Sequence, residues 1–263
     1  MSVTLTFDQG NSSTKAQAFD SLTLRPLAWR IVSCTDARAD LQRLMDTLPE
    51  AERHVDAAIG CSVASEAAGR ECLAELLATC GADTTMELTA ATPVPIRNCY
   101  ATPATLGPDR LAAAVGAAAL FPGRELLVVD LGTACTFDVV TADGRYLGGN
   151  IAPGPGMRLR ALSSFTARLP QVDPLSSQVP EFGADTPSAM MAGAFRGLLA
   201  ELLYYSGNGR QRLTVLSGGW VNKMLPLLPA DFPCRHCVNL VNEGLNRILH
   251  HNVTIPHHFN NAI

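Results

Sequence analysis

The chain has 263 residues, of which 47% are hydrophobic and 17% charged, and a formal net charge of −4. This composition is that of a globular protein with room for one or two cores, and the absence of a Lys/Arg run argues against nucleic-acid binding. No apolar run reaches the roughly 18 residues of a membrane span and no signal peptide is recognisable, so a cytoplasmic protein without membrane contact is expected.

The first half is expected to open with strands and to continue with alternating helices and strands. Alternating β-forming residues predict an antiparallel meander of three strands, at residues 3–7, 16–19 and 25–32. Apolar spacing and turn residues then predict a helix over 39–50, a buried strand over 54–63 and a helix over 66–82 that is closed by Gly81.

A Pro- and Thr-rich connector follows, at residues 89–110, and it is long for a loop without a function. A helix over 109–123 leads from it into the second half, and strands are expected at 125–130, 135–141, 145–148 and 212–219. Two further helices are expected, an apolar one at 188–206 and a closing one at 239–251, while the tail 255–263 is left without assigned structure.

The eight cysteines are expected to be mostly reduced thiols, as in other cytosolic proteins. Three stand among Ala and Leu and are expected to fill the core: Cys61, Cys72 and Cys80. The pair Cys234 and Cys237 forms a single CxxC, which with His257 and His258 is a weak alternative for a structural zinc site.

Two stretches of the chain, Asp8–Thr14 and Asp130–Thr136, follow the same pattern. Each has an Asp after an apolar strand, then a Gly two residues later, then small polar residues that lead into another strand. They begin 122 residues apart (130 minus 8), close to half the chain length, so the sequence predicts a duplicated domain.

Phosphate binding explains this pattern. A Gly turn exposes backbone N–H groups that form an anion-binding concavity, and Asn, Ser and Thr side chains add donors. The Asp at the strand end is suited to a metal ion or to metal-bound water. Two ordinary β-turns are the alternative, but the repetition and a third Gly turn at Gly218-Gly219 favour nucleotide binding. The P-loop motif is absent.

With these motifs in place, the chain resembles type III pantothenate kinase, within the superfamily of actin, hexokinase and the heat-shock ATPases. The resemblance is carried by "DQGNSSTK", "YATPATLGPDRLAAAVGA", "VVDLGTACTFDVVTADGRYLGGNIAPG" and "FGADTPSAMMAG", joined by "LSGG" and "EGLNRIL". These stretches cover most of the chain in the family's order.

The resemblance implies an α/β fold of two duplicated ribonuclease-H-like domains, 1–122 and 123–263, with mixed sheets flanked by helices and the active site in the cleft between them. It implies phosphorylation of pantothenate by ATP to 4′-phosphopantothenate, the first step of coenzyme A biosynthesis. The implied cofactors are Mg²⁺ and a monovalent cation, K⁺ or NH₄⁺. The implied assembly is a homodimer.

The resemblance also implies which residues bind ATP and metal ions. ATP phosphates are assigned to six residues: Asp8, Gly10, Asn11, Ser12, Lys15 and Thr133. Asp8 is also assigned to Mg²⁺, directly or through water, and Asp130 to the monovalent cation. The alternative for Asp130 is a strand-end residue that caps its own turn.

Asp109 matches the family's general base, which takes the proton of the attacking hydroxyl. Its alternative role is structural, because Pro108 suits the first position of a helix and an aspartate beside it favours the helix dipole. Arg110 is assigned to the pantothenate carboxylate, with a surface arginine as the alternative. The remaining substrate contacts implied by the family are Tyr100, Gly107, Pro108 and Thr186, the last supplied by the partner subunit. Asp138 is left unassigned.

Two other functions remain open at this point. A small-molecule kinase of the same superfamily acting on another substrate, such as a sugar, would keep both Asp-x-Gly hairpins. The pairing of Gly107 with Arg110 favours an acid instead. A non-catalytic regulatory accessory factor is the second alternative, although every catalytic position is filled.

Overall fold

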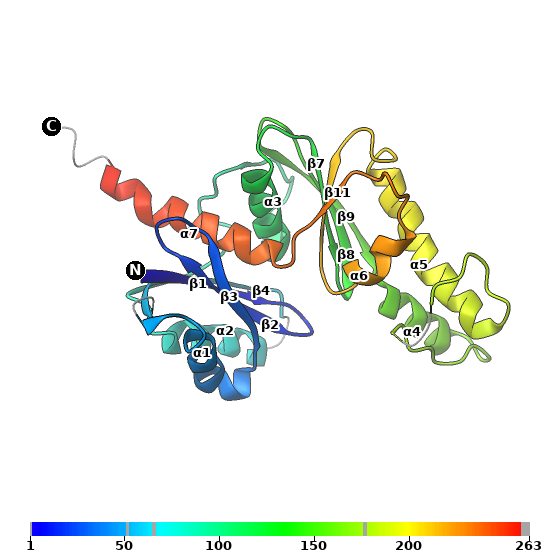
Figure 1. Ribbon diagram of the computed structural model, residues 1–263, viewed down its shortest axis with the longest axis horizontal. Helices are drawn as coiled ribbons and strands as arrows, with labels where there is room; N and C mark the ends of the chain where they lie inside the picture. Colours follow the sequence, from blue (N-terminus) through cyan, green and yellow to red (C-terminus); the bar gives the residue numbers. More distant parts are fainter. Residues whose placement is uncertain (1, 51–52, 65–66, 176–177, 259–263) are drawn as a thin grey trace. The chain divides into compact units, whose positions relative to one another are not determined.

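The computed structural model describes residues 2–50, 53–64, 67–175 and 178–258 (Figure 1). Contacts between Cα atoms divide the chain into two compact units. Unit 1 comprises Met1–Pro122, Gly144–Tyr146 and Asn239–Ile263, and unit 2 comprises Gly123–Asp143 and Leu147–Val238. The C-terminal segment thus groups with the N-terminal half, and the domain limits 1–122 and 123–263 stay a prediction.

Unit 1 is built on a five-stranded sheet in the order β3-β2-β1-β4-β5. Its strands are β1 (Ser2–Gln9), β2 (Thr14–Asp20), β3 (Pro26–Val32), β4 (His54–Ser62) and β5 (Thr84–Glu87). The first three form the predicted antiparallel meander, and β4 and β5 run parallel to β1. The short turn after β1 lets β2 return antiparallel, whereas the parallel strands need helical crossovers.

Side chains alternate along β1, so its two faces pack against different helices (Figure 1). Val3, Leu5 and Phe7 are fully buried in a core shared with α1 (Ala37–Met45) and α2 (Ala67–Thr79). The opposite face presents hydroxyls to α7 (Leu240–His258). Thr4 donates a hydrogen bond to Asn246 Oδ1 at 2.7 Å, and Thr6 donates one to Asn242 Oδ1 at 2.8 Å. Helices therefore cover both faces of this sheet.

The helix α3 (Pro108–Leu120) packs closely against α7 because small residues meet where they touch. A Cβ atom at Gly116 would lie 2.5 Å from the carbonyl oxygen of Leu240, and one at Gly244 would lie 1.7 Å from that of Ala112. Real Cβ contacts are never this short, so the two backbones approach as only glycine permits. This packing fixes the helix whose first turn carries Asp109.

We expect Gly244→Ala to destabilise the protein by about 3 kcal/mol, because the added methyl group forces α3 and α7 apart in a packed core. Thermal unfolding measures the effect. Gly193→Ala is the matched control, since Gly193 lies in the helix α5 (Thr186–Tyr205) and its would-be Cβ has no packing neighbour within 4 Å outside the local helix backbone. That control should gain about 0.5–1 kcal/mol from helix propensity. Equal effects of the two substitutions would contradict the close α3–α7 packing.

Unit 2 repeats the strand order of unit 1. Its sheet runs β9-β8-β7-β10-β11, with β7 (Leu126–Leu131) antiparallel to β8 (Ala134–Val140) and parallel to β10 (Leu213–Ser217). The remaining strands are β9 (Arg145–Pro153) and β11 (Cys234–His236). The first two residues of β9 also pair with β6 (Arg97–Asn98), within unit 1. The shared order confirms the predicted duplicated α/β fold with mixed sheets.

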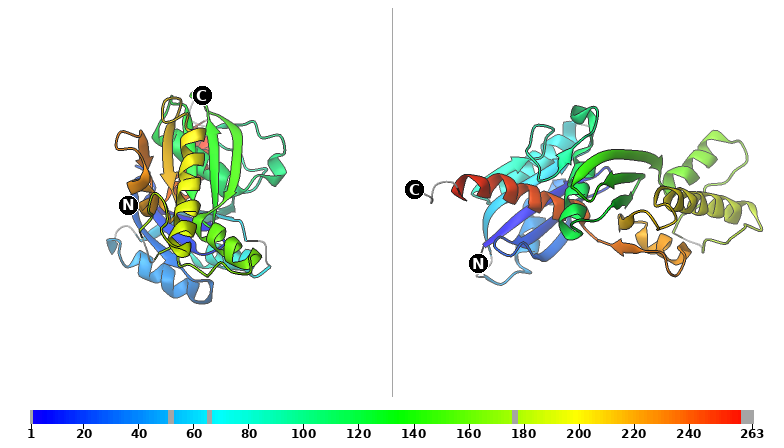
Figure 2. Two further views of the ribbon diagram at one scale, coloured as in Figure 1. Left: turned by 90° about the vertical axis from the view of Figure 1, so that its right-hand side faces the viewer. Right: turned by 90° about the horizontal axis from the view of Figure 1, so that it is seen from above.

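Two helices close one face of the sheet in unit 2, and Figure 2 shows α5, in yellow, lying along its strands. Leu127, Val129 and Phe137 form a core with Phe195 and Leu198 of α5. The shorter helix α4 (Pro155–Phe165) adds Leu159 to this core. An Arg158–Glu201 pair, at 2.6 and 2.7 Å from one guanidinium nitrogen to both carboxylate oxygens, joins α4 to α5.

Several elements differ from the sequence expectations. The structure adds β5, β6, α4, β11, a single-turn helix α6 (Val221–Met224) and 3₁₀ turns at Cys34–Asp36, Pro103–Thr105 and Leu225–Leu227. β9 continues to Pro153 instead of ending at 148, and α7 continues to His258, so part of the tail without assigned structure is helical. The other predicted helices and strands are confirmed, with ends displaced by a few residues.

The cysteine predictions are mostly confirmed. Cys61, Cys72 and Cys80 are buried, and the described free thiols include the CxxC pair. The prediction of a reduced thiol is wrong for Cys72, which is disulfide-bonded. The side chains of His257 and His258 lie outside the described part, and no cluster of metal-ligating side chains in that part includes Cys234 or Cys237. None of the described helices combines the length and the apolar character that crossing a membrane requires.

Candidate active site

The first Asp-x-Gly hairpin joins β1 to β2 in unit 1. The N–H of Gly10 donates to the carbonyl of Ser13 at 3.1 Å, which closes the turn and leaves Asn11 and Ser12 exposed at its tip. Strand register places Asp8 opposite Lys15, with 3.7 Å between Lys15 Nζ and Asp8 Oδ2. The structure therefore presents a carboxylate, an ammonium and a polar turn at one strand end, as predicted from the sequence.

The carboxylate of Asp8 is buried, and its pKa is raised. Burial, and to a smaller extent the charge of Asp109, raises the pKa of Asp8 from its ordinary value of 3.8 to about 6, although Lys15 opposes the shift. Asp8 is only 8% exposed, so desolvation of the anion is the main cause. Two neighbouring carboxylates with one lysine leave negative charge that a hard cation with oxygen ligands, such as Mg²⁺, would neutralise.

Asp109 lies in the first turn of α3, near Asp8. The N–H of Arg110 donates to Asp109 Oδ1 at 2.8 Å, and Pro108 occupies the first helical turn, so the predicted structural role of these residues is present. A Cβ at Gly107 would lie 2.5 Å from Asp109 Oδ1, so glycine leaves the room in which this carboxylate sits. The functional role and the helix-start role are compatible, because the helix holds the carboxylate in place.

Arg110 is buried rather than on the surface, with 7% of its area exposed. Its guanidinium carbon lies 5.7 Å from the centre of the Tyr100 ring, within the range of a cation–π contact. The Tyr100 ring in turn lies 6.1 Å from that of Tyr146. The structure thus brings Tyr100 and Arg110 together beside Asp109, and the alternative of a surface arginine is wrong.

The thiol of Cys61 was predicted as a core residue, but its position next to the two carboxylates was not. Cys61 of β4 pairs with Asp8 in the strand register. Burial, followed by the charges of Asp8 and Asp109, holds the pKa of the Cys61 thiol well above its usual value. The thiol is therefore neutral and unreactive, and it adds to the apolar surroundings that raise the pKa of Asp8. Only the pairing of β1 with β4 reveals this neighbour.

The second Asp-x-Gly hairpin joins β7 to β8 in unit 2 and is surrounded by glycine backbone. The N–H of Gly154 donates to the Thr133 carbonyl at 3.0 Å. Gly218 has a φ of +99°, and a Cβ there would lie 2.4 Å from Asp130 Oδ1. The turn after β10 therefore lies against Asp130, a contact that the sequence did not predict. Close backbone approach with exposed N–H groups is typical of phosphate-binding turns.

The other predicted residues of unit 2 have simpler surroundings. Thr186 is exposed at the start of α5, beside the N-cap Asp185, which accepts from the N–H of Ser188 at 2.8 Å. Asp138 is buried on β8, next to the backbone of Gly149. Asp138 stays without an assigned role.

Solved structures with the same fold include a Baf-family protein from Campylobacter jejuni, with a TM-score of 0.59, 19% identity and coverage of 95% of this chain and 100% of that one. Another is the activator of 2-hydroxyisocaproyl-CoA dehydratase from Clostridium difficile with bound ADPNP, with a TM-score of 0.55, 13% identity and 99% coverage of both chains. Together with the two repeated sheets, these neighbours define an α/β protein of the actin-like ATPase and hexokinase fold.

The family within this class is settled by sequence. Residues 4–205 match the model of the type III pantothenate kinase family. A type III pantothenate kinase from Porphyromonas gingivalis is 37% identical over 96% of this chain and all of its own length. One from Phocaeicola vulgatus is 44% identical over 64% of this chain and 69% of its own. The chain belongs to the type III pantothenate kinase family, whose members are ATP-dependent kinases.

Proposed function

We propose that this protein transfers the γ-phosphoryl group of ATP to the primary hydroxyl of pantothenate, which yields ADP and 4′-phosphopantothenate in the first step of coenzyme A biosynthesis. The observation that carries the proposal is the group formed by Asp8, Asp109 and Arg110 in a chain of this family. It combines a metal-binding carboxylate, a base and a buried cation for an acid substrate.

Phosphoryl transfer depends mainly on positioning and charge neutralisation. The pantothenate oxygen forms the new bond to the γ-phosphorus, the bond from that phosphorus to the bridging oxygen breaks, and the hydroxyl proton passes to Asp109. Arg110 binds the pantothenate carboxylate with its planar guanidinium, and Tyr100, Gly107 and Pro108 complete the substrate element. Rigid placement of Asp109 by α3 supports its role as base.

ATP phosphates are assigned to both hairpins, through Gly10, Asn11, Ser12, Lys15 and Thr133. Asp8 would hold Mg²⁺, because its buried carboxylate beside Asp109 has an excess of negative charge. Mg²⁺ supplies charge neutralisation on the phosphates when bound. Asp130 would hold a monovalent cation, K⁺ or NH₄⁺, where the backbone of Gly218 approaches it.

The proposal includes a cytoplasmic homodimer in which Thr186 contributes to the partner's substrate site. Unit 2 carries large apolar side chains on its surface, which is the type of surface that a second subunit covers. They are Leu147, Ile151, Met157, Leu162, Phe165, Phe182 and Tyr204. Molar mass measured by light scattering tests the dimer, and a monomeric active enzyme would contradict it.

The test of the function is ADP release from ATP, measured with and without pantothenate, first in K⁺ and then in Na⁺. We expect turnover that requires both pantothenate and K⁺. Pantothenate-independent turnover, or turnover with a sugar in its place, would favour another kinase of the superfamily. A folded protein that binds ATP but has no turnover with any acceptor would favour the accessory-factor alternative.

We expect Arg110→Lys to raise the KM for pantothenate by about 10- to 100-fold, which corresponds to the loss of one charged, bidentate contact. Lysine keeps the charge but not the planar pair of donors that matches a carboxylate. Steady-state kinetics measure the effect, and Arg97→Lys, at an exposed position in the preceding strand β6, is the matched control. An unchanged KM in the Arg110 variant would contradict its assignment.

A further inference from the structure

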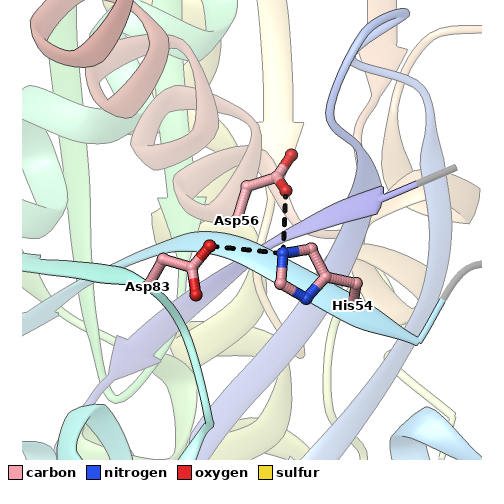
Figure 3. A group of neighbouring side chains, drawn as sticks. All are labelled: His54, Asp56 and Asp83. Atoms are coloured by element: carbon pink, nitrogen blue, oxygen red, sulfur yellow. Dashed lines mark ion pairs between the residues drawn. The ribbon is translucent and has the colours of Figure 1, made fainter.

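A second group of side chains that could bind a metal ion lies in unit 1, far from Asp8 along the sheet. It consists of His54, Asp56 and Asp83, whose ligand atoms all lie within 4.8 Å of one another. In Figure 3 both carboxylates point toward the same nitrogen of the His54 ring. His54 Nε2 lies 3.5 Å from Asp56 Oδ1 and 3.2 Å from Asp83 Oδ2.

We propose that His54, Asp56 and Asp83 form a binding site for a divalent metal ion of the class that includes Zn²⁺, Ni²⁺ and Cu²⁺, with Zn²⁺ as the probe. The distances between the ligand atoms are the first observation in favour of a metal ion. Zn²⁺ binds imidazole nitrogen and carboxylate oxygen at about 2.1 Å, so two ligands at tetrahedral or octahedral angles lie about 3.0–3.4 Å apart. The two distances from His54 Nε2, 3.2 and 3.5 Å, are close to this range, and all three ligand atoms lie within 4.8 Å of one another, so one ion would reach all three side chains after small rotations.

The negative charge of the two carboxylates also favours a divalent cation at this place. Two carboxylates converge on one imidazole nitrogen, which bears at most one proton and can donate only one hydrogen bond. Within the described part of the chain, no lysine or arginine forms an ion pair with Asp56 or Asp83. A divalent cation would neutralise both carboxylates at once, whereas a proton on His54 would neutralise one.

The backbone prepares this arrangement. The pairing of β1 with β4 skips Asp56, because Val3 pairs with Val55 and Thr4 pairs with Ala57. Such a bulge is rare between parallel strands and re-aims the side chain of the extra residue. The hydroxyl of Ser2 donates to Asp56 Oδ2 at 2.5 Å, which leaves Oδ1 directed at His54. A hydrogen bond on the outer oxygen is a common way to orient a metal-binding carboxylate.

The donor set selects the class of metal. Imidazole favours Zn²⁺, Ni²⁺ and Cu²⁺ over Mg²⁺ and Ca²⁺, and carboxylates accept all of them. Three protein ligands on an exposed edge leave one or more positions for water. The site is separate from the proposed Mg²⁺ site, because Ser2, which pairs with His54, and Asp8 are six residues apart on β1, or about 20 Å. Its effect is therefore on the stability of unit 1, where it would link the starts of β4 and β5.

The test uses the full chain with the other accessible soft ligands removed by Cys99→Ser, Cys234→Ser and Cys237→Ser, and it measures Zn²⁺ binding by calorimetry. We expect this background to bind one more equivalent of Zn²⁺ than its His54→Gln and Asp83→Asn derivatives. His236→Gln, at an exposed histidine in unit 2, is the matched control and should bind like the background.

Thermal unfolding gives an independent readout. Zn²⁺ at ten times its Kd should raise the Tm of the background by about 2–4 °C over the value in EDTA, and this rise should be absent from both derivatives. Cooperative unfolding of each derivative in EDTA shows that it is folded. Kinase turnover with Mg²⁺ should be the same in all of them. Equal Zn²⁺ binding by background and derivatives, or loss of the Zn²⁺ effect in the His236 variant alone, would overturn the proposed site.

Discussion

Replacing Asp109 by Asn is expected to leave a folded protein whose kcat is about 10²- to 10⁴-fold lower, the usual contribution of a general base. The substitution keeps the size of the side chain. It also keeps the oxygen that accepts the hydrogen bond from the N–H of Arg110. The side chain loses the negative charge that takes the hydroxyl proton.

The control for this experiment is Asp231→Asn, at an exposed carboxylate in unit 2. Both variants should unfold within a few degrees of the parent protein and bind ATP. A folded Asp109 variant with near-normal kcat would show that Asp109 only starts the helix. In that case the loose transition state of phosphoryl transfer would need no base.

The Asp109 variant makes a second, independent measurement possible. Because the charge of Asp109 raises the pKa of Asp8, its removal should lower the pKa of Asp8 below the value of about 6. Binding of Mg²⁺ and a non-hydrolysable ATP analogue should then persist to lower pH than in the parent protein. An unchanged pH dependence would mean that the two carboxylates are not neighbours.

The repeated architecture was accessible to sequence reasoning because its signals are local. The β1–β2 hairpin follows from an alternating strand and a Gly turn, and the same pattern recurs in β7 and β8. The helices with strong apolar periodicity, such as α1, were found for the same reason. In these segments the local sequence alone favours the structure that is observed.

The missed elements depend on contacts that are distant in sequence. The helix α4 begins in a Pro- and Gly-rich run that indicates a turn, and it is held by Leu159 in the core and by the Arg158–Glu201 pair. The short strands β5 and β11 form only because β4 and β10 offer them an edge. Propensity is a weak guide where tertiary packing decides.

The candidate site also has features that the sequence predicts and features that depend on the fold. The motif residues could be named from the resemblance, but their electrostatics could not. The raised pKa of Asp8 requires its burial, its pairing with Cys61 across two strands and the approach of Asp109 from α3. The bulge that isolates Asp56 is likewise invisible in the sequence, because it is a property of the register between β1 and β4.

Asp8→Asn should stabilise the protein above pH 6 while it abolishes Mg²⁺-dependent turnover. The pKa of Asp8 is raised from 3.8 to about 6 in the folded protein, so folding favours the protonated acid. Stability from this group is therefore complete below pH 4 and is lost as the pH rises through 6. The cost above pH 6 is at most about 3 kcal/mol, and loss of the partly exposed Lys15 partner reduces the gain from Asn.

Unfolding of the Asp8 variant and the parent protein at pH 4 and pH 8 measures this difference, which should be large at pH 8 and vanish toward pH 4. The buried Asp40 is the matched control of opposite sign. The N–H of Ser33 and then two arginines lower its pKa, so Asp40→Asn should destabilise the protein at pH 8 and lose that effect in acid. A destabilised Asp8 variant at pH 8 would show that Lys15 more than offsets the burial of the carboxylate.

Activity should follow the same titration in the opposite direction. A protonated Asp8 cannot hold a cation, so the KM for Mg²⁺ in the parent enzyme should rise about tenfold for each pH unit below 6. The charge that weakens the fold is then the charge that binds the metal, which is the expected relation between stability and function at an active site. An enzyme whose Mg²⁺ dependence is flat from pH 5 to pH 8 would exclude Asp8 as the metal ligand.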